Sequence, residues 1–142
     1  ERGLTLRSPG RFMAAADRLI DLYRRRPDEH LRDEVAQAWM NAEAYRLLTF
    51  QAISRMLQTG RPMGAEASVM KLWWSELDVH LNETAQRLVG ADAELGLDSE
   101  AAPDGGRWLD GWLFSLAGPI YAGTNEIQRN VVAERVLGLP RV

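Results

Sequence analysis

Residues 118–141 read GPIYAGTNEIQRNVVAERVLGLPR, and this stretch carries the strongest structural signal in the chain. A short turn at residues 122–124 leads into a helical pattern, which glycine and proline end at residues 138–140. Thr124 is a good N-cap because its hydroxyl can accept a hydrogen bond from a first-turn amide, and Glu126 suits the positive helix end. The free amides of such a turn can hold a carbonyl oxygen or a phosphate. We therefore interpret the stretch as part of a functional site.

Apolar residues also recur at helical spacing in three long segments upstream, over residues 12–23, 35–56 and 69–88. Glycine and proline separate these segments. A last helical unit is expected to start near Arg107, to break at Gly118 and Pro119, and to resume after Thr124, while residues 91–106 form a long loop. No segment alternates with period two for long enough to predict a strand. Short connections between long amphipathic helices favour an all-α fold, an antiparallel four-helix bundle, with residues 1–142 forming a single domain.

Composition and charge narrow the class of protein. Of the 142 residues, 46% are hydrophobic and 26% charged, as in ordinary globular domains. No apolar run approaches the roughly 20 residues that a membrane helix needs, and no signal-peptide pattern is present, so we expect a cytoplasmic protein without membrane insertion. The absence of cysteine excludes disulfides and thiolate chemistry. The net charge is −3, and the one basic cluster, Arg24–Arg26, suits a helix end better than phosphate, which argues against a nucleic-acid partner.

Three blocks of sequence resemble a known family. Residues 120–141 resemble the C-terminal signature of the acyl-CoA dehydrogenases, in the bacterial branch whose chains end in GTNEIQRN…AERVLGLPR. Residues 67–77, ASVMKLWWSEL, are similar to the KL…SEL helix of that family, and the opening Glu1–Arg2 resembles a third block. The family's C-terminal domain is a helical bundle, in agreement with the periodicity. Because the chain opens on Glu1 without an initiator methionine, the resemblance implies the C-terminal part of a longer three-domain protein.

The resemblance also implies a reaction, the α,β-dehydrogenation of an acyl-CoA thioester. In this family a glutamate removes the α-proton while the β-hydrogen leaves as hydride to FAD, and a backbone amide holds the thioester carbonyl. FAD is therefore the implied cofactor and acyl-CoA the implied substrate. The implied partners are related subunits in a homo- or heterotetramer and an electron-transfer flavoprotein as electron acceptor.

The position of the catalytic base departs from the usual pattern. In many family members the glutamate stands immediately before the Gly-Thr of the signature, where this chain has Ala122. The backbone amides of Ala122 and Gly123 remain as substrate-binding groups. Some members place the base in a Glu-Arg pair at the start of the first helix, which the opening of this chain resembles, so Glu1 is the candidate catalytic residue. Two alternatives stay open: a catalytically idle subunit that supports an active partner, and a related flavin monooxygenase.

The cofactor contacts that the resemblance implies are Thr124 and Glu126, a position at which many relatives carry glutamine. Two family segments are missing. The "R..FG" segment after the first helix has no counterpart in residues 27–32, and the "GG.G" loop after the third helix is replaced by residues 90–96 and a longer insertion. Both segments concern flavin held across a subunit interface, so their loss predicts a remodelled or half-occupied cofactor site.

The remaining polar residues give weaker signals. His30 and His80 are far apart in sequence and have no ligand-spaced partner, so no metal site is predicted. Glu76 and Asp78 stand near Lys71 and His80 on the third helical segment, where surface ion pairs are expected.

Two adjacent tryptophans, Trp73 and Trp74, lie in the third helical segment. Neighbouring residues on a helix point about 100° apart. One of the two is therefore expected to pack on another subunit or domain, unless a wide core stripe covers both.

Overall fold

The computed structural model describes residues 7–141, and within them every regular element is helical. The α-helices of this part of the chain are α1 (Pro9–Arg25), α2 (Arg32–Thr59), α3 (Glu66–Val89), α4 (Arg107–Ser115) and α5 (Asn125–Arg135). Short 3-10 helices span Glu29–Leu31, Gly90–Glu94 and Pro103–Gly106, so the predicted loop at 91–106 is partly helical. The prediction of an all-α fold is confirmed.

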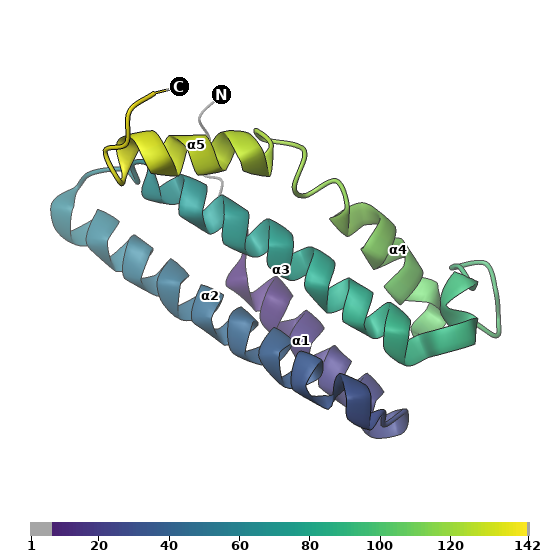
Figure 1. Cartoon of the computed structure of the whole chain (residues 1–142). Helices are drawn as coiled ribbons and strands as arrows, with labels where there is room; N and C mark the ends of the chain where they lie inside the picture. Colours follow the sequence, from purple (N-terminus) through teal and green to yellow (C-terminus); the bar gives the residue numbers. More distant parts are fainter. Residues whose placement is uncertain (1–6, 142) are drawn as a thin grey trace.

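The long helices α1, α2 and α3 lie side by side in antiparallel order, and α4 and α5 follow one another along α3 (Figure 1). The fourth position of the bundle is thus shared by two short helices. The expected interruption at Gly118 and Pro119 is confirmed, because these residues lie in the turns between α4 and α5. The N-terminal half of α3 contacts α5 and its C-terminal half contacts α4.

Local chemistry explains where the helices begin and end. Pro9 occupies the first turn of α1, where a missing amide hydrogen costs nothing. At the end of α2, Gly60 adopts the left-handed conformation with φ 65°, and its amide donates to the Met56 carbonyl at 2.9 Å. The left-handed Gly60 therefore ends α2 and starts the turn towards α3.

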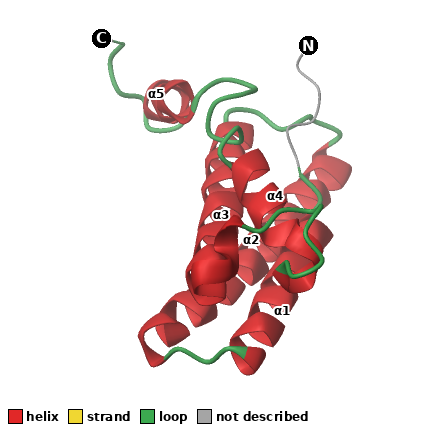
Figure 2. Ribbon diagram, turned by 90° about the vertical axis from the view of Figure 1, so that its right-hand side faces the viewer, coloured by secondary structure: helices red, strands yellow, loops and turns green. Residues whose placement is uncertain are grey.

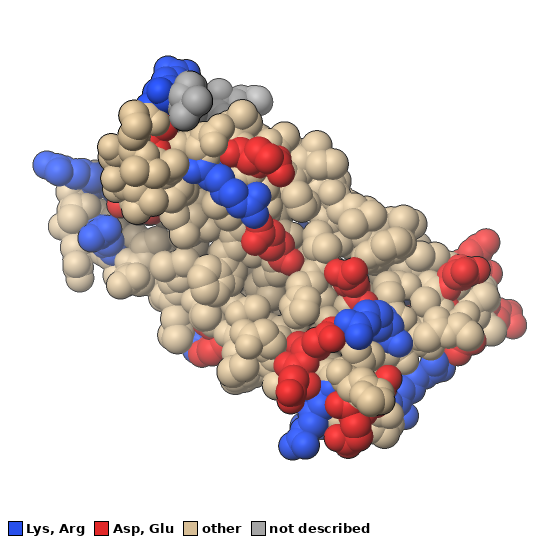
Figure 3. All heavy atoms as spheres, in the orientation of Figure 1, with Lys and Arg blue, Asp and Glu red and all other residues tan. Residues whose placement is uncertain are grey.

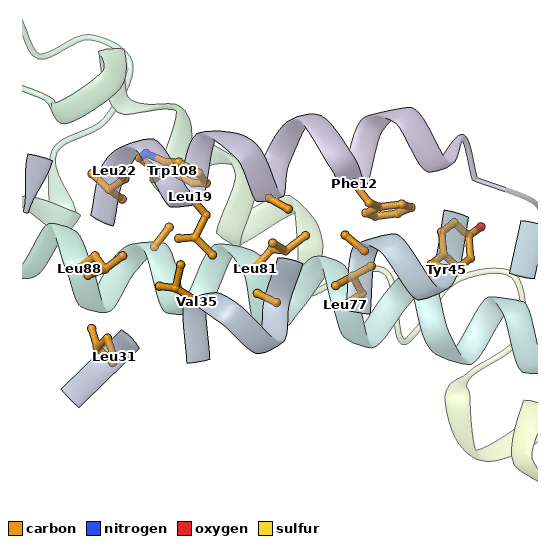
Figure 4. Packing of buried hydrophobic residues seen from close by; sticks show 14 of the residues in the cluster. Phe12, Leu19, Leu22, Leu31, Val35, Tyr45, Leu77, Leu81, Leu88 and Trp108 are labelled. Atoms are coloured by element: carbon orange, nitrogen blue, oxygen red, sulfur yellow. The ribbon is translucent and has the colours of Figure 1, made fainter. Parts of the chain in front are cut away.

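The core lies between α1, α2 and α3, and Trp108 of α4 closes it at one end (Figure 4). Phe12 and Tyr45 meet edge to face with ring centroids 5.3 Å apart. Farther along, Leu19 and Leu81 are fully removed from solvent. Burial of such side chains stabilises the fold by roughly 1.5 to 3 kcal/mol each.

The basic cluster Arg24–Arg26 makes structural contacts at one end of the bundle. Arg25 donates to both carboxylate oxygens of Asp104 at 2.8 Å, and Arg26 donates to the Val89 carbonyl at 2.8 Å. Arg26 also pairs with Asp92. The cluster thus joins the end of α1 to the end of α3 and to the segment that follows it. On the face drawn in Figure 3, the described basic residues form no continuous stripe.

The adjacent tryptophans take different surroundings. Trp74 is buried in the core, whereas Trp73 is 37% exposed and donates to the Asn41 carbonyl of α2 at 3.1 Å. A single core stripe covering both residues is therefore wrong. The predicted packing of one tryptophan on another subunit or domain stays a prediction.

Candidate functional site

The turn of residues 121–124, between α4 and α5, carries the two predicted substrate-binding residues. Ala122 and Gly123 both have positive φ, 56° and 85°, which is unusual for an alanine. The side-chain amide of Gln128 donates to the Ala122 carbonyl at 3.0 Å and holds this conformation. Both residues are exposed, and within residues 7–141 their backbone amides find no hydrogen-bond acceptor. The turn therefore presents free donors to the outside.

Thr124 is the N-cap of α5, as predicted, and its hydroxyl accepts from the Ile127 amide at 3.4 Å. Glu126 lies in the first turn, where hydrogen bonds from its own amide and from the Thr124 hydroxyl lower the pKa of its carboxyl group. Glu126 thus occupies the positive end of α5, as predicted. The roles of Thr124 and Glu126 towards a cofactor stay predictions.

A polar cluster under the turn fastens α5 to α3. We call it the Asn125 cluster, and its members are Lys71, Ser75, Glu76, Asn125 and Arg129. The buried side-chain oxygen of Asn125 accepts from the Lys71 ammonium at 2.6 Å and from the Ser75 hydroxyl at 3.1 Å. Its amide nitrogen donates to Glu76 at 3.2 Å, and Glu76 also pairs with Arg129 of α5. Burial lowers the pKa of Lys71, while the charges of Glu126 and Glu76 oppose this shift.

The prediction of surface ion pairs along α3 holds for Glu76, which is exposed and pairs with Arg129. It is wrong for Lys71 and Asp78. Lys71 points into the interior and Asp78 is buried against α1, where Arg11 pairs with it at 2.8 Å. Burial raises the pKa of Asp78, and the Arg11 charge works against that rise. In the described part of the chain no three His, Asp or Glu side chains come together as metal ligands.

Arg7 connects the beginning of the described chain to the turn. Its guanidinium donates to the Tyr121 hydroxyl at 2.7 Å and lies over the rings of Trp74 and Tyr121, 5.2 and 5.5 Å from their centroids. The Tyr45 hydroxyl of α2 donates to the Arg7 carbonyl at 2.9 Å. Glu1 and Arg2 lie outside the described residues, whereas Arg7, the first described residue, contacts Tyr121, which precedes Ala122.

A groove in the described residues lies away from the turn. It has a volume of about 670 Å³ and opens between the end of α2 and the start of α3, where Met56, Met63 and Met70 line it. None of the predicted site residues lines this groove. The turn is an exposed feature, so a substrate bound there would need further protein surface to exclude water.

Comparison with known proteins agrees with this architecture. The family model "Acyl-CoA dehydrogenase, C-terminal domain" matches residues 1–137. The chain belongs to this family. Acyl-CoA dehydrogenase IpdE1 of Mycobacterium tuberculosis is 34% identical over 99% of the chain, and IpdE1 of Mycolicibacterium smegmatis is 35% identical over the same share. The chain covers 36% and 34% of these two proteins, about a third of their length.

Solved acyl-CoA dehydrogenase structures share the fold. The ChsE4-ChsE5 complex of Mycobacterium tuberculosis matches 98% of this chain and 37% of its own with a TM-score of 0.83 and 24% identity. The Tcur3481-Tcur3483 steroid acyl-CoA dehydrogenase matches 94% of this chain and 35% of its own with a TM-score of 0.82 and 23% identity. The similarity to an acyl-CoA dehydrogenase domain inferred from residues 120–141 is confirmed.

Acyl-CoA dehydrogenases are oxidoreductases that generally use FAD, and the turn fits part of such a group. Exposed amides and a hydroxyl lie at the positive end of α5, which suits electronegative atoms. Glu126 is ionised and exposed, so it suits a hydroxyl or amine donor of FAD better than its phosphates. The two segments that depart from the family pattern, residues 27–32 and 90–96, lie at the other end of the bundle, where Arg26 pairs with Asp92 (Figure 1).

The sequence interpretation missed four residues around the turn: Arg7, Lys71, Asn125 and Gln128. One signal could have pointed to Lys71, because it is the only lysine among 17 basic residues. Asn125 and Gln128 stand inside the signature stretch, but nothing in their spacing says what they hold.

Proposed function

We propose that the protein to which this chain belongs catalyses the α,β-dehydrogenation of an acyl-CoA thioester. In this proposal the amides of Ala122 and Gly123 hold the thioester carbonyl, Glu1 takes up the α-proton, and Thr124 and Glu126 lie against FAD. When bound, FAD would accept the β-hydrogen as hydride, and an electron-transfer flavoprotein would reoxidise it. Related subunits complete the assembly.

The contact between Arg7 and Tyr121 is the observation that carries this proposal. Glu1 precedes Arg7 by six residues, a stretch that spans at most about 20 Å when extended. Arg7 touches Tyr121, the residue before Ala122. The Glu1 carboxylate could therefore reach a thioester held at the turn. It would replace the glutamate that many family members carry at the position of Ala122.

The free amides supply the second part of the chemistry. Two donors at the positive end of a helix stabilise negative charge on the thioester oxygen as the α-proton leaves. The Gln128 side chain and the Thr124 cap hold the turn in place before substrate arrives. Donors fixed in advance cost little reorganisation during the reaction.

An idle subunit in a heteromer is the second candidate. Ala122 offers no proton acceptor. Two structural relatives carry paired names, the ChsE4-ChsE5 complex and Tcur3481-Tcur3483. In this version a homologous subunit supplies the base and this chain supplies a docking surface. The Tcur3481-Tcur3483 relative is named a steroid acyl-CoA dehydrogenase, which makes acyl-CoA thioesters with fused rings worth testing beside straight-chain ones.

The test uses the full-length protein, expressed alone and together with a homologous subunit. Bound flavin and the bleaching of its absorbance on addition of each acyl-CoA are measured. We expect Glu1→Gln to slow bleaching by a factor of about 10² or more, as for loss of a general base. Glu29→Gln, which alters an exposed glutamate at the far end of the bundle, is the matched control and should bleach normally.

Two results would redirect the assignment. Normal bleaching by Glu1→Gln would exclude Glu1 as the base. Flavin that binds only after co-expression, with bleaching insensitive to Glu1→Gln, would favour the idle subunit.

A further inference from the structure

Lys71 is the only lysine in a chain that otherwise uses arginine, and it is 1% exposed. An ammonium group that is removed from water is costly unless it is paired or hydrogen-bonded. Its described hydrogen-bond partner is the side-chain oxygen of Asn125, at 2.6 Å. The contact joins residues 54 positions apart, from the middle of α3 to the first residue of α5.

Few buried side chains hold α5 on α3. Of its 11 residues, only Asn125 is buried within the described chain. Ile127 is 54% exposed, and the remaining apolar residues of the helix are only partly buried. A helix this short is marginal on its own in water, so packing or polar contacts must hold it. Figure 2 shows α5 at the edge of the bundle, above the start of α3.

Asn125 also fixes the turn before it. Its backbone amide donates to the Pro119 carbonyl at 2.9 Å and closes the loop that contains residues 121–124. The position of Asn125 therefore constrains both the start of α5 and the turn. Displacing Asn125 would displace the amides of Ala122 and Gly123 with it.

A lysine suits this place better than an arginine. Its ammonium is a compact point charge on a flexible apolar stem, whereas a guanidinium is broad and planar. The Lys71 nitrogen lies 6.0 Å from the centroid of the Trp74 ring, which is buried beside it. Ser75 supplies a second, neutral donor to the same Asn125 oxygen.

We propose that Lys71 is a positioning residue that, through Asn125, holds the turn of residues 121–124 in the geometry that presents the Ala122 and Gly123 amides. The positioning itself follows from contacts within residues 7–141. Its catalytic consequence rests on the proposed function, so the two need separate measurements.

The first measurement follows the turn without substrate. Hydrogen exchange of the peptide covering residues 119–130 is read by mass spectrometry in the full-length protein. Loss of a buried, charged hydrogen-bond donor is expected to speed its exchange by about tenfold or more in Lys71→Met. Lys71→Gln, which keeps an N–H donor, should recover part of the protection. Glu83→Gln, an exposed change in the half of α3 that faces away from α5, is the matched control and should leave exchange unchanged.

If the Lys71 variants fold poorly, the rate of chemical labelling of Lys71 itself tests the proposal in a chain that keeps this lysine. An amine-reactive reagent should label Lys71 slowly in the wild type, because labelling requires α5 to detach. Asn125→Leu should speed labelling of Lys71 by about tenfold, measured by peptide mapping. Exchange in Lys71→Met and labelling in Asn125→Leu that both match the wild type would overturn the proposal.

The second measurement separates positioning from general stability. In the assembly loaded with FAD, Lys71→Met should lower the limiting rate of flavin bleaching by about tenfold and leave the acyl-CoA dissociation constant within about threefold. Loosened exchange with an unchanged limiting rate would overturn the catalytic consequence. A wild type that never bleaches would instead contradict the proposed dehydrogenation, and the exchange and labelling results would still decide the role of Lys71.

Discussion

In α1, α2 and α3, apolar side chains such as Phe12, Leu19 and Leu81 are fully removed from water, whereas Asn125 is the one residue of α5 that is buried within residues 7–141. The two regions share α3, whose one face carries leucines and whose N-terminal half also carries Lys71 and Ser75. The bundle is thus held by many weak, non-directional contacts. The turn and α5 are held by a few directional ones.

The turn and α5 are expected to unfold locally before the core does. Segments with few buried apolar contacts open at a lower free energy than the packed core. The predicted site lies on such a segment, where Ala122, Gly123 and Ile127 are exposed. An exposed site of this kind suits a protein in which neighbouring domains or subunits complete the enclosure, in line with the proposed function.

The largest effect on stability is expected in the packed core. Leu81→Ala removes a fully buried side chain from the centre of α3 and should lower the free energy of unfolding by about 2 to 5 kcal/mol. Urea denaturation of the full-length protein, followed by far-UV circular dichroism, measures this loss. Leu57→Ala, at a leucine that is 81% exposed, is the control and should stay within about 0.5 kcal/mol of the wild type. Equal effects of the two variants would contradict the packing described for α3.

A smaller effect is expected at the turn. Gly123→Ala places a methyl group at φ 85° and within 2.6 Å of the Gln128 amide nitrogen. The left-handed conformation alone costs an alanine about 1 to 2 kcal/mol, so exchange of residues 119–130 should speed up while the urea midpoint stays nearly constant. Ala122→Gly is the matched control, because glycine relieves the strain at φ 56° and adds unfolded-state freedom, two effects of similar size. A fall in the urea midpoint as large as that of Leu81→Ala would show that the turn and the core open together.

The packed region could be predicted from the sequence because its signal is periodic. Apolar residues spaced for a helix face predicted α1, α2 and α3 within a few residues of their ends. Gly60 and Pro119 marked two of the interruptions. Thr124 was also predictable, since an N-cap depends on neighbours three positions away.

The support of the site could not be predicted in the same way. Lys71 meets Asn125 across 54 residues, and Arg11 meets Asp78 across 67, so local spacing contains no trace of either pair. On the sequence alone, Asp78 and Lys71 resemble ordinary charges of a solvated helix face. Only the packing of α1 and α5 against α3 reveals that both charges are buried. The role of Glu1 stays a prediction, because it lies outside the described residues.

The smallest effect is expected from the Glu126 carboxylate at the start of α5. Bonds from its own amide and from the Thr124 hydroxyl lower the pKa of Glu126 below its usual value of 4.5, so the folded state favours the carboxylate. The stabilisation of α5 is therefore fully present above pH 4.5 and is lost as the pH falls through the lower, folded-state pKa. Glu126→Gln should speed the exchange of residues 119–130, corrected for the intrinsic pH dependence of exchange, at neutral pH but not at the acidic end. Glu134→Gln, near the negative end of the same helix, is the matched control and should leave protection unchanged or slightly raise it. Equal increases in exchange for both variants would contradict stabilisation of the turn by the Thr124–Glu126 cap. An effect of Glu126→Gln that persisted at acidic pH would contradict it as well.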